Sequence, residues 1–252
     1  MARYKVFLIF PVMLSVLVAI AHADTYIVKH SHTDEYEIAS VEKVIPAKDE
    51  FIVTWFTQDE LRLDRGADKD FADRSTIVRL DLNKTYLLDH TLMSYSEYSL
   101  DIMEGMTEEM SDSSGIDFGQ VMESFDIEVR VDDTGEVERI GNWACKIYEV
   151  TTVVFGFTSK RRVWATRDID IDYDLYDKLR IATSPQQQGA MKNIVKEMQQ
   201  IDGLEVRSTS TTEVMGATVR TREELITIEE REAPDELYDI PPGYVPSDEA
   251  LW

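Results

Sequence analysis

The sequence predicts a mainly β (α+β) protein in which successive strands pair in antiparallel fashion. After residue 23 the chain is dominated by short runs rich in β-branched and aromatic residues, separated by charged or turn-forming residues. These runs are so closely spaced that hairpins are the natural connections between them. The strongest helix signal is confined to one segment, residues 184–203.

Residues 1–23 have the order of a cleavable signal peptide. Arg3 and Lys5 precede an apolar run over residues 6–20, and small residues end at Ala23. The run is shorter than the roughly 20 residues of a membrane-spanning helix, which disfavours the alternative of a membrane anchor. No cysteine follows the run directly, so a lipid-attachment site is missing. We expect an exported protein, periplasmic or extracellular, that is soluble after cleavage near Ala23 and has no transmembrane segment in the mature chain.

The N-terminal half of the mature chain predicts an antiparallel meander. The expected strands cover residues 25–33, 35–44, 51–57, 60–64, 75–82, 85–89 and 93–100. Only Asn83 and Lys84 separate two of them, and asparagine tolerates the positive φ of a tight hairpin turn. Residues 101–125 are Met-rich and acidic, and predict two short helical pieces around a turn-rich break.

Strands are expected to resume after this break and to alternate with hairpin turns. We predict strands at 125–133, at 138–158 after a turn at Thr134-Gly135, and at 160–168. A short helix is expected at 175–182.

The segment 184–203 is the strongest predicted helix. Ser184 suits the N-cap, Pro185 suits the first helical position, and Gly203 stands where a helix commonly stops. Its apolar residues recur at spacings of three and four, giving one stripe that we expect to lie on the sheet. Two further strands, 204–214 and 218–232, follow.

The final residues, 233–252, are rich in proline, which argues against a regular helix or a central strand. We found no internal repeat and no linker, so residues 24–252 are expected to form a single domain.

Charge restricts the possible partners. The chain has 26 Lys and Arg against 49 Asp and Glu, a formal net charge of -23. Such a field repels polyanions, so nucleic acid is excluded as an expected partner, and an anionic membrane surface is disfavoured. Strong acidity is compatible with basic partners or a salt-rich habitat, and the sequence does not choose between them.

The sequence contains none of the common catalytic motifs. A GxSxG elbow, a phosphate-binding glycine loop, HExxH and CxxC are all missing. Paired carboxylates are uninformative in a chain with 49 acidic residues. We therefore expect a protein that is not an enzyme and needs neither a cofactor nor a metal.

Cys145 is the only cysteine of this exported chain. On a strand it shares a face with Trp143 and Ile147, so we interpret it as a small core residue rather than a nucleophile or an intermolecular disulfide.

Two other groups raise the question of metal binding. His30 and His32 share a strand face, but the sequence shows no third ligand, and exposed strands often carry such residues. The alternating carboxylates of residues 168–177 invite a calcium interpretation. An EF-hand loop, however, needs glycine and glutamate where Tyr173 and Leu179 stand. We favour a solvated carboxylate face, and the sequence leaves calcium open.

Two segments resemble the signature of a family of exported bacterial proteins of unknown function. The first is a Gly-x-x-x-Cys-x-x-Tyr strand followed by a strand with a tryptophan. The second is a C-terminal LYDIPPGYVP-like stretch. The matching positions are Gly141, Cys145, Tyr148 and Trp164, and then Leu237, Ile240, Pro241, Gly243 and Tyr244. That family is similar to the LolA/LolB-like lipoprotein-carrier superfamily.

The resemblance implies a fold and a function. The fold would be a curved antiparallel incomplete barrel with helices packed on its concave side, LolA-like, around an apolar cavity able to hold acyl chains. The function would be non-enzymatic binding of an apolar or lipid-like ligand. The alternative is an envelope or extracellular protein-interaction module with a packed interior and no ligand, whose partner would be a protein of the envelope. Candidate ligand-binding residues are Trp55, Tyr86, Met93, Tyr95, Trp143, Trp164, Met191 and Met198, although ordinary core packing also explains each of them.

Overall fold

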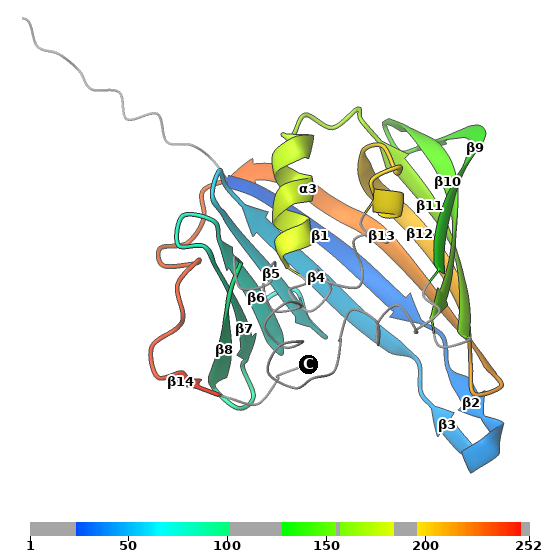
Figure 1. Cartoon of the computed structure of the whole chain (residues 1–252), viewed down its shortest axis with the longest axis horizontal. Coiled ribbons are helices and arrows are strands. Elements are labelled where there is room, and N and C mark those ends of the chain that lie inside the picture. Colours follow the sequence, from blue (N-terminus) through cyan, green and yellow to red (C-terminus); the bar gives the residue numbers. More distant parts are fainter. Residues whose placement is uncertain (1–23, 101–127, 155–156, 184–195, 248–252) are drawn as a thin grey trace, which may run out of the picture.

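The structure is a computed structural model that describes residues 24–100, 128–154, 157–183 and 196–247 (Figure 1). The leader, the region 101–125 and most of the helix expected at 184–203 lie outside these residues. Within the described part, residues 196–198 are helical. No described helix is long and apolar enough to cross a membrane.

The described protein is mainly β, and its principal element is one large curved sheet that is not closed into a barrel (Figure 1). The twelve strands of this sheet follow the order β14-β8-β7-β6-β5-β4-β1-β13-β12-β11-β10-β9. Neighbours are antiparallel except for the short β14, which runs parallel to β8. The first strand of the chain, β1, therefore lies in the middle of the sheet and joins the two meanders.

The bounds of the elements confirm most of the predicted strands. The strands of the large sheet are β1 (Asp24–Thr33), β4 (Lys48–Phe56), β5 (Glu60–Gly66), β6 (Arg74–Arg79), β7 (Lys84–Asp89), β8 (Ser94–Ser99), β9 (Glu128–Ile140), β10 (Trp143–Val154), β11 (Phe157–Thr166), β12 (Leu204–Val214), β13 (Ala217–Arg231) and β14 (Val245–Pro246). The turn predicted between β6 and β7 is confirmed, since Asn83 has a φ of 57°.

The prediction of one continuous strand at 35–44 is wrong. That stretch forms a separate small hairpin of β2 (Tyr36–Ile38) and β3 (Lys43–Ile45), which encloses the 3-10 turn η1 (Ala39–Val41). The hairpin projects from the end of β1 and β4 (Figure 1). The turn was not predicted because the β-rich pattern continues through it and no glycine or proline marks it.

The turn predicted at Thr134-Gly135 is also wrong. β9 continues through these residues, and the pairing with β10 shifts there, between Lys146 and Tyr148. Gly135, at a φ of 71°, serves a bulge, while the hairpin turns instead at Gly141, at a φ of 58°. Glycine with positive φ suits both a bulge and a turn, so local sequence did not distinguish them.

The helix predicted at 175–182 is confirmed as α3 (Tyr173–Ala182). The carboxylate of Asp172 accepts a hydrogen bond from the backbone N–H of Leu175 at 3.0 Å, which is an N-cap. α3 lies over one face of the sheet (Figure 1), and Leu179 and Ala182 are buried there. The hydroxyl of Thr85 on β7 donates to the carbonyl of Ala182, which fixes the end of the helix to the sheet.

We call the apolar residues beneath the helix the α3 cluster. Its buried members are Ile27, Phe56, Leu61, Val78, Cys145, Ile147, Trp164, Ile169, Leu179, Ala182, Leu204 and Val206. They come from both meanders and from α3, so this cluster unites the two halves of the sheet.

The C-terminal segment, residues 233–247, covers the opposite face of β4 to β8. Side chains alternate along these strands, so that Phe56 faces α3 while Val53 and Trp55 face the segment. Tyr238 packs on this second face. The prediction that the tail is neither helix nor central strand is confirmed, since its one strand is the two-residue β14 at the sheet edge.

Candidate functional site

The predicted ligand-binding residues fall on two faces of the sheet. Trp143 and Trp164 belong to the α3 cluster, Trp143 half-buried and Trp164 buried. The indole N–H of Trp164 donates to Glu138 at 2.8 Å, and the guanidinium groups of Arg162 and Arg207 lie 5.6 Å and 5.8 Å from its ring centroid. The ring therefore packs among apolar residues, contacts two cationic groups, and has its polar edge fixed by Glu138.

Met198 packs half-buried against a second small cluster on the β9–β11 side. The buried members of that cluster are Val131, Tyr148, Val150, Val163 and Ala165. Met191 lies outside the described residues.

Three of the remaining candidates lie under the C-terminal segment. Trp55 is stacked against Tyr26, with ring centroids 4.4 Å apart, and Tyr86 lies edge-on to Tyr95 at 6.3 Å. Residues of the C-terminal segment, Tyr238 among them, cover both groups. Met93 is exposed in the turn before β8, so the structure does not bring the predicted residues together in one place.

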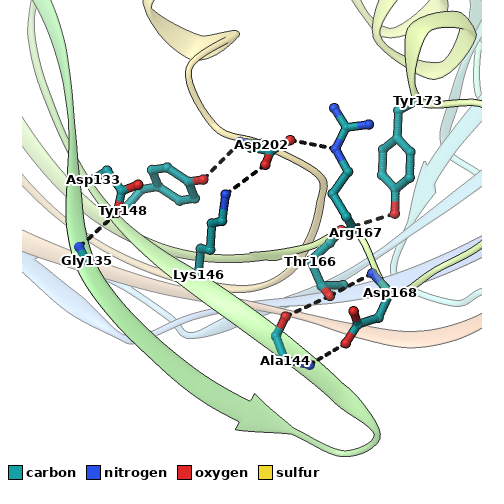
Figure 2. Close-up of polar contacts among 10 residues, drawn as sticks. All are labelled: Asp133, Gly135, Ala144, Lys146, Tyr148, Thr166, Arg167, Asp168, Tyr173 and Asp202. Atoms are coloured by element: carbon teal, nitrogen blue, oxygen red, sulfur yellow. Dashed lines mark hydrogen bonds and ion pairs between the residues drawn. The ribbon is translucent and has the colours of Figure 1, made fainter.

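A polar network joins β10 to the segment between β11 and α3 and to Asp202, which precedes β12 (Figure 2). The carboxylate of Asp202 accepts from Lys146 at 2.9 Å and from Arg167 at 2.5 Å, and its backbone N–H donates to the hydroxyl of Tyr148 at 3.3 Å. The hydrogen bonds from Lys146 and Arg167 hold the pKa of Asp202 below its usual range. The start of β12 is thus tied to β10 and β11 beside the α3 cluster.

The acidic run 168–177 supplies acceptors for this framework. Asp168 accepts from the backbone N–H of Ala144 at 2.7 Å (Figure 2), and Asp172 caps α3. The hydroxyl of Tyr173 donates to the carbonyls of Thr166 and Ile169. Among the described residues, no group of three or more His, Cys, Asp and Glu is arranged to hold a metal ion.

The pair His30 and His32 has a hydrogen-bonding partner that the sequence did not reveal. Both imidazoles contact the same carboxylate oxygen of Asp49, at 2.9 Å and 2.8 Å. These hydrogen bonds join β1 to β4 at the base of the β2–β3 hairpin, where His32 is paired with Asp49. The two histidines thus act as structural partners of one carboxylate.

A group of charged residues lies next to α3 that sequence reasoning missed. The guanidinium of Arg161 contacts Glu205 and, at 3.4 Å, Glu223. Burial lowers the pKa of the nearby Lys29, but the charges of Glu205, Tyr176 and Glu223 outweigh this effect and leave that pKa raised. The paired strands β11, β12, β13 and β1 place these residues side by side, so only the sheet order could have revealed them.

A cleft of about 280 Å³ lies on the sheet face away from α3, and we call it the β5 cleft. Its lining consists of Phe51, Val53, Arg62, Asp64, Arg65, Gly66, Asp68, Lys69, Asp70, Phe71, Ala72 and His90. These residues come from β4, β5, the connection to β6, and the turn after β7. No motif in the sequence marks this cleft.

A directional series of hydrogen bonds runs beside the β5 cleft, and its members Arg62, Asp64 and His90 line the cleft. The hydroxyl of Ser75 donates to Asp64, so it can only accept from the Nε2–H of His90, 2.5 Å away. The other ring nitrogen of His90 then accepts from the hydroxyl of Tyr244, also at 2.5 Å. Arg62 donates to Asp64 at 2.7 Å and to Ser75 at 3.2 Å. Asp64 and Ser75 are a cross-strand pair of β5 and β6.

The histidine in this chain is held in its neutral form. Burial lowers the pKa of His90, and the adjacent guanidinium of Arg62 lowers it further. Both ring nitrogens of His90 are engaged in hydrogen bonds, and Ser75 is buried. We therefore interpret these residues as a rigid hydrogen-bonded structure and not as an exposed nucleophile with its base.

Comparisons with known proteins agree with a family of unknown function. The family model described as "Domain of unknown function (DUF4412)" matches residues 40–244. No curated protein matches the chain significantly. A solved structure, of an uncharacterized conserved protein from Thermus thermophilus, is 6% identical with a TM-score of 0.41, over 90% of this chain and 92% of that one.

Proposed function

We propose that this protein, which belongs to the family Domain of unknown function (DUF4412), is a non-enzymatic exported protein that binds an apolar or lipid-like ligand. The ligand would be held between the curved sheet and its helices, with the helices on the concave side as in LolA-like carriers. The location would be the periplasm or the extracellular space, after cleavage near Ala23.

One observation carries this proposal. The sheet is not closed, and the α3 cluster retains half-buried apolar side chains around its buried members. Trp143, Leu175 and Tyr176 are such residues, drawn from β10 and α3. An acyl chain that replaced water at this rim would gain about 0.8 kcal/mol for each buried CH₂.

The charged group beside α3 favours a ligand with a polar end. Arg161 lies with Glu205 and Glu223 on the strands next to the cluster, and the charges of these two carboxylates contribute to the raised pKa of the nearby Lys29. An amphiphile could leave its head at this group while its chain lies among apolar residues. This arrangement supports a lipid-like ligand over a pure hydrocarbon.

The alternative of an interaction module would use the acidic surface or the Pro-rich tail. The apolar side chains of that tail, Tyr238, Ile240 and Tyr244, already pack on the sheet. This packing supports the ligand-binding proposal over an interaction through the tail.

The test is native mass spectrometry of residues 24–252, purified without detergent from an exporting host, followed by organic extraction. The proposal predicts an added mass that extracts as lipid, or one that forms on incubation with oleic acid. A matched pair of variants locates the ligand. Trp143→Ala removes a rim residue of the α3 cluster and should weaken oleate binding, whereas Leu82→Ala, in an exposed turn, should not. A mass that stays that of the protein alone with oleic acid and mixed lipids would contradict the proposal.

A further inference from the structure

We propose that the β5 cleft is a second binding site, which takes an uncharged saccharide. It lies on the face of the sheet away from α3, beside the C-terminal segment, and is therefore separate from the lipid-like site proposed above. The inference does not depend on that function.

The connection that forms one side of the cleft is preformed. The backbone N–H of Asp73 donates to the carbonyl of Arg65 at 2.8 Å, and the N–H of Asp70 donates to the carboxylate of Asp68 at 2.8 Å. At Gly66 a Cβ atom would lie 2.2 Å from the carbonyl oxygen of Phe71, so only glycine permits this close approach. A ligand would meet an ordered loop and would lose little free energy in shaping it.

Two aromatic rings line the cleft. Phe51 is partly buried, whereas Phe71 is 77% exposed, the highest value among the large apolar residues described. A solvated phenyl ring beside a preformed cleft offers a flat apolar surface of the kind that packs on the C–H face of a pyranose ring. A small inorganic ion would make no use of this surface.

The charges in the cleft argue against an ionic ligand. Arg62 is paired with Asp64, Arg65 with Glu50 at 3.1 Å, and Lys69 with Asp70 at 2.8 Å. An anion would have to displace one of these carboxylates. The charged side chains of the lining, which include Asp68, are three positive and three negative, so the cleft has no net charge to attract an ion. A neutral polyol displaces none and meets no net charge penalty.

Hydroxyl groups can instead use the remaining hydrogen-bonding capacity of these pairs. Within the described part of the chain, both contacts of the Asp64 carboxylate fall on Oδ1, which leaves Oδ2 able to accept. Arg65 and Lys69 are half-exposed at the mouth and still have N–H groups to donate. Fixed acceptors and donors beside an aromatic ring are the chemistry that recognises vicinal hydroxyls.

The uncharged side chain of His90, which lines the cleft, also fits an uncharged saccharide. His90 is uncharged near neutral pH, with both nitrogens engaged by Ser75 and Tyr244. It therefore adds a rigid surface without adding a charge that would select an anion.

The experiment applies labelled residues 24–252 to a printed glycan array, and then titrates each retained neutral oligosaccharide by calorimetry. Phe71→Ala is the test variant and Phe157→Ala, which removes another exposed phenylalanine at the start of β11, is the matched control. We expect retention of at least one neutral glycan, an affinity about tenfold lower in Phe71→Ala, and unchanged affinity in Phe157→Ala. Circular dichroism establishes that both variants are folded.

Three results would overturn the inference. These are the retention of no neutral glycan, retention of sulfated or other anionic glycans alone, and equal binding by wild type and Phe71→Ala. Oleic acid is included as a competitor. Because the two sites lie on opposite faces, oleate should not displace the saccharide. A negative result at one site therefore does not contradict the proposal for the other.

Discussion

The Nδ1 atom of His90 lies 2.5 Å from the hydroxyl oxygen of Tyr244, although the two residues are 154 positions apart in the chain. This contact fixes the C-terminal segment to the turn after β7. Close to it, the backbone N–H of Val245 donates to the carbonyl of Met93 at 3.0 Å, and that of Ser247 donates to Tyr95 at 2.8 Å. The segment is therefore anchored by a side chain and by backbone pairing together.

Tyr244→Phe removes the donor to His90 and should reduce the free energy of unfolding by about 1 to 2 kcal/mol, because a half-buried acceptor loses its partner. Urea denaturation measures the change. Tyr36→Phe, on the β2–β3 hairpin, is the control, since its hydroxyl has no hydrogen bond among the described residues. Equal stability of Tyr244→Phe and wild type would show that the contact contributes nothing.

The lowered pKa of His90 makes stability depend on pH. Its folded-state pKa lies below the ordinary 6.5, so the unfolded chain takes up the proton first as the pH falls. The contribution of this group is fully present above about pH 6.5 and decreases below it. We expect the free energy of unfolding to fall as the pH is lowered from about 7 to below 6.5, the ordinary pKa of histidine, and to fall less in His90→Gln. If both proteins show the same pH profile in this window, His90 is not the titrating group.

Gly203 should tolerate no side chain. It has a φ of +111°, and an added Cβ atom would lie 2.3 Å from the carbonyl oxygen of Thr166. Gly203→Ala should lower the free energy of unfolding by about 3 kcal/mol or more. Gly141→Ala is the matched control, because that glycine has a φ of +58° with open space around it, and should cost about 1 kcal/mol. Similar losses in urea denaturation would contradict the steric argument.

Cys145 should resist thiol reagents while the protein is folded. It is fully buried, and burial raises the pKa of its thiol, so little thiolate is present and none is accessible. We expect slow labelling by Ellman's reagent in buffer and complete labelling in urea. Thr211→Cys in a Cys145→Ala background provides an exposed thiol as the positive control. Native labelling of Cys145 as fast as that control would show a reactive group.

Local patterns predicted the parts of the fold that depend on neighbouring residues. The strand predicted at 204–214 matches β12, and the burial of Cys145 followed from its alternation with Trp143 and Ile147. Asn83 adopts the positive φ that its place between two strands required. Each of these features is set by side-chain period or turn chemistry within a few residues.

Contacts between distant segments could not be predicted in this way. Trp55 and Tyr86 were expected to line a cavity, yet the structure places them beneath Tyr238 of the C-terminal segment. The pattern of a strand shows that a residue faces inward, but it does not show which segment covers that face. The hydrogen bond between His90 and Tyr244 likewise depends on where the C-terminal segment lies.

The most direct test of the account is tryptophan quenching by a brominated stearic acid, since bromine quenches an indole only at close contact. Trp143 lies in the α3 cluster and Trp55 lies on the opposite face, so the two report on different sites. If the lipid-like ligand binds beneath α3, Trp143→Phe should lose a large part of the quenching while Trp55→Phe keeps it. Quenching that depends on Trp55, or no quenching at all, would contradict the central claim.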